Sequence, residues 1–152
     1  MINNSPPGYG GKLFWRMIMS TRSVIAIKNA DNTITGVYAH FDGYLEHNGK
    51  ILFENYSDNT KLHKLIEQGA ISILKSRIGR KHKFGKDTDS TTFYHRDRGE
   101  ALRVSTWKNE KQMIRDMYDC EYFYVFEDNT WKYSRGDEFY NLEEALQKLR
   151  KI

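Results

Sequence analysis

The chain has 152 residues, of which 39% are hydrophobic and 14% aromatic, a composition that predicts one globular domain and excludes a disordered chain. Its one cysteine, Cys120, excludes an internal disulfide, and no apolar run approaches the roughly 20 residues of a membrane span, so we expect a cytoplasmic protein that needs no membrane. The net charge of +4 indicates nucleic-acid binding only weakly, because Lys12 and Arg16 supply half of it from an opening segment without acids.

That opening segment, residues 1–18, holds both prolines and several glycines. Trp15-Arg16 has codons that can form a ribosome-binding sequence just before Met19. We therefore expect residues 1–18 to be a translated leader or a flexible N-terminal arm, and residues 19–152 to form a single α+β domain. The alternative is an arm whose aromatic side chains, Phe14 and Trp15, pack on the domain.

The elements that follow begin with a hairpin, because residues 24–27 and 34–41 are rich in β-formers and flank a turn signal at Asp31-Asn32. Two helices are then predicted, at 45–56 and at 60–68; Ser57-Asp58-Asn59 supplies capping side chains for the second.

The second half is predicted to contain an exposed loop at 79–90, short strands at 91–94 and 102–106, a helix at 109–118, a hairpin of strands 122–127 and 130–134, and a helix at 142–149. This order predicts an α+β fold in which an antiparallel sheet is built from two hairpins plus short strands. We expect about four helices, packed mainly on one face of that sheet.

The segment from His40 to His47 places two imidazoles and two carboxylates where the second strand meets a helix. Because side chains alternate along a strand, His40 and Asp42 are expected on one face, where Asp42 can orient the imidazole ring. Three interpretations compete: a structural turn at Asp42-Gly43, a ligand-binding site of His40, Asp42 and Tyr44, or a small hydrolase or phosphodiesterase with His40 as general base. No metal-site spacing is present, so neither a metal nor another cofactor is expected.

A second polar group contains Arg96 and Arg98, which alternate with Asp97 and Glu100. Guanidinium groups bind phosphate or carboxylate through two parallel (bidentate) hydrogen bonds, so both arginines are candidates for binding an anion. The alternative is a surface turn whose charges neutralise one another.

Residues 75–86 contain six basic residues and no acid. Arg80, Lys81, Lys83 and Lys86 are candidate contacts to nucleic-acid phosphates. A solvated loop is the other interpretation, because Phe84 is the only aromatic residue in this stretch and single-strand binders usually interleave several.

Taken together, several motifs resemble a family of small uncharacterised proteins of tailed bacteriophages and prophages. They are Met19-Ser20-Thr21-Arg22-Ser23, Gly36-Val37-Tyr38-Ala39-His40-Phe41-Asp42-Gly43-Tyr44, Gly49-Lys50-Ile51-Leu52 with Tyr56, Thr92-Phe93-Tyr94, Arg96-Asp97-Arg98-Gly99-Glu100, and Tyr124-Val125-Phe126 followed by Trp131-Lys132. The resemblance covers most of residues 19–134 and favours Met19 as the natural start. The chain departs from the family pattern at Phe41, where Trp is common, and at Leu45, where Pro is common.

The resemblance implies a bacteriophage accessory protein that acts by binding rather than by catalysis. Its role would be host takeover or counter-defence in the cytoplasm of the host cell. Its partner would be a host protein, which it sequesters or inhibits, or a small anionic ligand such as a nucleotide. Nucleic acid, bound through residues 75–86, is the alternative partner, and the hydrolase is the other alternative function.

Overall fold

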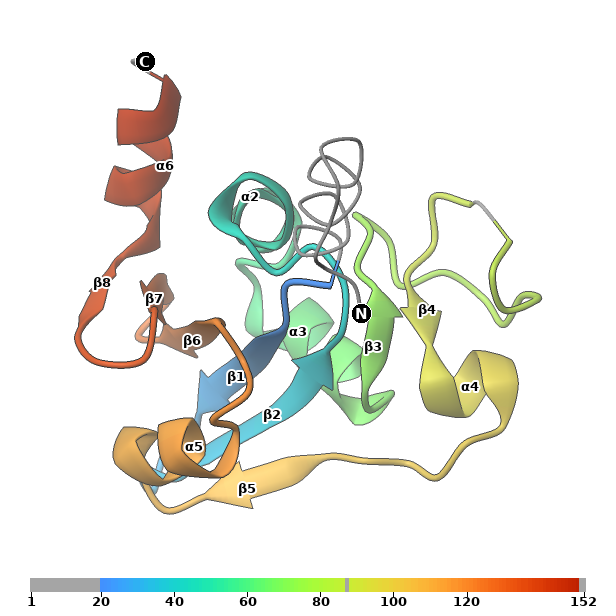
Figure 1. The fold of residues 1–152 in the computed structure, drawn as a ribbon, viewed down its shortest axis with the longest axis horizontal. Helices are drawn as coiled ribbons and strands as arrows, with labels where there is room; N and C mark the ends of the chain where they lie inside the picture. Colours follow the sequence, from blue (N-terminus) through green and yellow to red (C-terminus); the bar gives the residue numbers. More distant parts are fainter. Residues whose placement is uncertain (1–19, 87, 151–152) are drawn as a thin grey trace, which may run out of the picture.

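The computed structural model describes residues 20–86 and 88–150, which form a central sheet with helices on both sides (Figure 1). The predicted leader lies outside the described residues. The strands are β1 (Ser23–Lys28), β2 (Ile34–Ala39), β3 (Ile71–Ile73), β4 (Thr92–Phe93), β5 (Ser105–Trp107), β6 (Tyr122–Glu127), β7 (Thr130–Ser134) and β8 (Phe139–Asn141). The helices are the π-helical turn η2 (Leu45–Gly49), α2 (Lys50–Asn55), α3 (Asn59–Glu67), α4 (Tyr94–Arg98), α5 (Glu110–Asp116) and α6 (Leu142–Arg150).

The sheet is mixed, which corrects the predicted antiparallel arrangement. Its main order is β4-β3-β2-β1-β6-β7-β8, and β5 also pairs with β2. Both predicted hairpins are present, β1 with β2 and β6 with β7. They meet, however, through β1 and β6, which run parallel from Ser23 opposite Tyr122 to Ile27 opposite Phe126. A hairpin pattern specifies only the pairing within the hairpin, whereas a parallel pair needs a long crossover, here the whole chain between β1 and β6.

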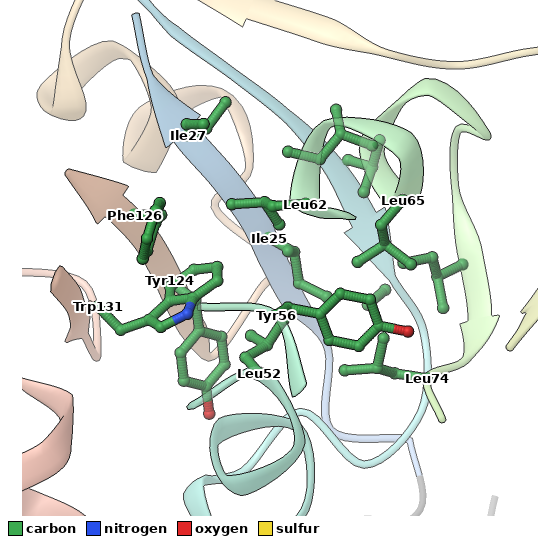
Figure 2. Close-up of a cluster of buried hydrophobic side chains, with 14 of the residues drawn as sticks. Ile25, Ile27, Leu52, Tyr56, Leu62, Leu65, Leu74, Tyr124, Phe126 and Trp131 are labelled. Atoms are coloured by element: carbon green, nitrogen blue, oxygen red, sulfur yellow. The ribbon is translucent and has the colours of Figure 1, made fainter. Parts of the chain in front are cut away.

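The two faces of the sheet carry separate hydrophobic cores, because side chains alternate along each strand. Ile25 and Ile27 of β1 face the larger core, shown in Figure 2, together with Tyr124 and Phe126 of β6. Helices α2, α3 and α6 cover that core with leucine side chains. The opposite face is covered by α5, whose Met113 is fully buried.

Local signals position the helices where the sequence predicted them. The Asp58 side chain accepts a hydrogen bond from the backbone N–H of Lys61 at 2.8 Å and caps α3. Asn109 caps α5 by accepting from the backbone N–H of Gln112 at 2.9 Å. The short helix α4 was not predicted. None of the helices in the described part of the chain combines the length and the apolar character needed to cross a membrane.

Candidate functional site

The segment after β2 is fixed mainly by its backbone. The N–H groups of His40 and Phe41 donate to two carbonyls of β3, at 2.9 and 3.1 Å. The N–H of Gly43 donates to Thr21 O at 2.8 Å, and the Gly43 carbonyl accepts from the buried Tyr124 hydroxyl at 2.6 Å. A Cβ at Gly43 would lie 2.8 Å from Thr21 O, so only glycine fits this approach to the start of β1. Much of the segment therefore has a structural role.

The expected hydrogen-bonded pair of His40 and Asp42 does not form. His40 Nδ1 instead lies 2.6 Å from the Tyr38 hydroxyl and shares a hydrogen bond with it. Burial raises the pKa of Tyr38 to about 12, so the phenol keeps its proton and can donate to the ring. Burial, with a smaller contribution from the charge of Arg22, lowers the pKa of His40, which favours a neutral imidazole.

The backbone of Asp42 is left-handed, with φ of +57°, so its side chain does not follow the alternation of side chains along the strand. Burial raises its pKa, and the nearby charges of His47 and Lys75 offset part of that effect. The Asp42 carbonyl accepts from the N–H of Asn48 at 3.1 Å, and its carboxylate does not orient His40, which bonds Tyr38 instead.

Tyr44 and His47 contribute to a turn built around Asn48. The Tyr44 and His47 rings lie 6.3 Å apart, and His47 Nδ1 lies 2.8 Å from Asn48 Oδ1. Asn48 is fully buried, and its amide donates to Ser23 Oγ at 3.3 Å and to the Phe41 carbonyl at 3.4 Å. Asn48 was missed by sequence reasoning, because nothing in the pattern indicates that an asparagine at a helix entry is buried.

Arg96 uses all five of its N–H donors inside the protein. Nε and Nη2 donate to the carboxylate of Asp97 at 3.0 and 3.2 Å. The remaining three donors reach backbone carbonyls, those of Ile78, Gly79 and Thr91, at 2.9–3.1 Å. The guanidinium group also lies over the Phe93 ring. With no donor left, Arg96 holds the preceding loop in place and has none to offer an anion.

Asp97, which sequence reasoning treated only as a counter-charge, organises the same loop. Its side chain has no exposed surface, and it accepts hydrogen bonds from the backbone N–H groups of His82 at 3.1 Å and Phe93 at 2.8 Å. Burial raises the pKa of Asp97, but the hydrogen bonds from Arg96, Phe93 and His82 outweigh it and leave the pKa below its ordinary value. Asp97 is therefore a charged, satisfied anchor beneath the loop.

Arg98 has a different environment from Arg96. It pairs with Glu100, and its guanidinium carbon lies 4.2 Å from the centre of the Phe84 ring and 5.0 Å from that of Tyr94. About half of the Arg98 side chain is exposed. Tyr94, whose ring lies 5.5 Å from that of Phe84, is a partner that the sequence did not indicate.

The loop between β3 and β4, whose backbone is bonded to Arg96 and Asp97, carries the predicted cations. Arg80, Lys81, Lys83 and Lys86 are all exposed. Between them, the His82 ring is fixed at both nitrogens, with Nδ1 3.0 Å from the Arg80 carbonyl and Nε2 3.0 Å from Thr92 Oγ1. Within the described residues of the loop, four positive charges therefore face solvent.

The two polar groups that contain the candidate ligand-binding residues lie on different parts of the sheet. His40 follows β2, whereas Arg96 and Arg98 belong to α4 after β4, and β3 lies between those strands. Figure 1 shows α4 at the far end of the sheet from β6, with the loop above it. Within residues 20–86 and 88–150, no three His, Cys, Asp or Glu side chains are placed to hold a metal ion.

Comparisons with protein-family models, with curated proteins and with solved structures find no match for this chain.

Proposed function

We propose that this protein binds nucleic acid through the phosphate backbone, using the loop that carries Arg80, Lys81, Lys83 and Lys86. The observation that carries the proposal is the contrast between the charges of α4 that lie beneath the loop and the charges that the loop itself exposes. The buried pair of Arg96 and Asp97 is satisfied internally, while the four cations above it face solvent. Lysine and arginine side chains held on an ordered support are the groups that contact phosphates.

The distribution of charge along the chain supports the same proposal. Residues 75–103 contain nine basic and four acidic residues, a net charge of +5. The rest of residues 19–152 contains 13 basic and 16 acidic residues, a net charge of −3. Positive charge is therefore concentrated in the loop and the adjoining α4, as in proteins that attract a polyanion to one surface.

The two other binding and catalytic hypotheses have less support from the geometry. A small anion clamped by Arg96 and Arg98 would have to displace the carbonyls that Arg96 holds and compete with Glu100 for Arg98. A hydrolase using His40 would lack the predicted help from Asp42. In a bacteriophage accessory protein acting in the host cytoplasm, as the family resemblance implies, nucleic acid would be the host or phage component bound.

The proposal is tested by fluorescence anisotropy with labelled DNA and RNA over a range of salt concentrations. We expect the affinity to fall steeply with salt, and the double variant Lys81→Ala/Lys83→Ala to reduce the slope of log K against log salt by roughly 2, about 1 for each lost phosphate contact. The matched control is Lys108→Ala/Lys111→Ala, which removes two exposed lysines near α5. Absent binding at low salt, or equal losses in both double variants, would reject the proposal.

A further inference from the structure

A stack of three planar groups lies beside the basic loop. Phe84 comes from the loop, whereas Tyr94 and Arg98 come from α4, and the rings and the guanidinium group are 4.2–5.5 Å apart. Arg98 covers Phe84, and Glu100 holds one edge of the guanidinium group through Nε and Nη2. This arrangement fixes the orientation of a planar, charged group at the surface.

Arg98 is the most exposed of the three groups. About half of the Arg98 side chain is exposed, although one of its sides rests on Phe84 and its edge is held by Glu100. A guanidinium plane of this kind is a surface on which a nucleic-acid base can stack. Neither Phe84 nor Tyr94 is fully buried, so both lie close enough to the surface to border such a base.

From this arrangement we infer that the site prefers single-stranded nucleic acid, with one unpaired base stacked on the guanidinium group of Arg98 beside the phosphate-binding loop. The inference rests on the proposed function, because the phosphates on either side of that base would be held by the loop cations. In a duplex the bases are stacked on one another and unavailable, whereas in a single strand each base exposes a face.

Phosphate attraction and base stacking can be separated with one conservative substitution. Arg98→Lys keeps the positive charge but replaces the plane with a compact ammonium group that cannot support a base. We expect it to weaken binding of single-stranded oligothymidine and oligouridine about fivefold or more, the lower end of what stacking of one base contributes. Binding of a duplex should stay within about twofold, because phosphate contacts depend on charge.

The matched control is Arg103→Lys, at an exposed arginine in the segment that follows the stack. A second measurement needs no variant: wild-type protein should bind an abasic strand more weakly than oligothymidine of equal length and charge. Circular dichroism of each variant verifies that the fold is retained. Binding of either the DNA or the RNA strand as described supports the inference.

The possible failures are distinct. If wild-type protein binds duplex and single strands equally and neither Arg98→Lys nor removal of the bases changes affinity, the base-stacking inference is wrong while phosphate binding stands. If no nucleic acid binds at low salt, the proposed function fails and the inference fails with it.

Discussion

Two polar regions of this molecule contain the same kinds of residue but use them differently. The segment from His40 to Asn48 and the region from Lys75 to Glu100 both contain histidines, acids and glycine. In the first, polar groups form hydrogen bonds with one another and with the backbone: Asn48 is buried, and both the N–H and the carbonyl of Gly43 are hydrogen-bonded. In the second, the ion pair of Arg96 and Asp97 bonds five backbone groups of the loop and its ends, while four cations of the loop face solvent.

The difference shows how a set of charged residues becomes available for binding. A side chain whose hydrogen bonds are complete inside the protein, such as Arg96, contributes to stability. A side chain supported by such an anchor but facing solvent, such as Lys81, can contact a ligand. A high density of polar residues in the sequence is compatible with a stabilising role and with a ligand-binding role. The hydrogen-bond partners of each side chain distinguish the two roles.

The largest effect on stability is expected from Asp97→Ala. The substitution leaves the Arg96 side chain, only 14% exposed, without its counter-charge and removes the acceptor for two backbone N–H groups. Breaking a buried ion pair in this way costs about 3–5 kcal/mol. Urea denaturation gives the change in the free energy of unfolding, and hydrogen exchange should show the loop amides losing protection first.

The control for that substitution is Asp89→Ala, in the same loop. Asp89 pairs with Arg77, but both side chains are 66% exposed, so the pair should contribute less than about 1 kcal/mol. Similar losses in the two variants would show that Asp97 does not anchor the loop.

A smaller loss is expected from Tyr124→Phe, which tests the other region. The variant removes the buried hydroxyl that donates to the Gly43 carbonyl at 2.6 Å and leaves that carbonyl without this partner. An unsatisfied buried acceptor costs about 1–3 kcal/mol. Tyr118→Phe is the control, because Tyr118 is 84% exposed and should change stability by less than about 0.5 kcal/mol. Thermal unfolding of both variants measures the difference, and equal melting temperatures would mean that the bond to Gly43 is not stabilising.

Local features of the fold were predictable from the sequence, and long-range ones were not. The hairpins and the capped helices follow from turn residues, alternation and capping side chains that lie within a few positions of one another. The parallel pairing of β1 with β6 joins residues about 100 positions apart, and nothing in either strand specifies a partner at that distance.

The candidate site was predictable to a similar extent. The exposed cations of the loop could be recognised as a run without acids, and the structure leaves them exposed. The role of Arg96 depends on three carbonyls, two of them more than 15 positions earlier in the chain, and the stack depends on Tyr94 reaching Phe84. The pairing of His40 with Asp42 was wrong because the strand ends at Ala39 and the left-handed backbone of Asp42 breaks the alternation on which it was based.

The smallest effect is expected from Asp42→Asn, and its sign is opposite to that at Asp97. The pKa of Asp42 is raised by burial, so ionising it as the pH rises above the ordinary value of 3.8 destabilises the native state relative to the unfolded chain. The variant cannot ionise, and asparagine tolerates the left-handed backbone. It should therefore be slightly more stable than the wild type at neutral pH, with the gain vanishing below the ordinary pKa. The pKa of Asp97 is lowered, so its contribution is lost in acid instead.

Urea denaturation between acidic and neutral pH measures this difference, with Asp128→Asn as the matched control. Asp128 is also left-handed, with φ of +54°, but it is exposed, so the change should matter little at any pH. A loss of stability at neutral pH in Asp42→Asn, absent from the control, would mean that His47 and Lys75 stabilise the carboxylate more than burial destabilises it. In that case the segment after β2 would, like the region of Asp97, contain a stabilising charge contact. The two polar regions would then differ less than their hydrogen bonds indicate.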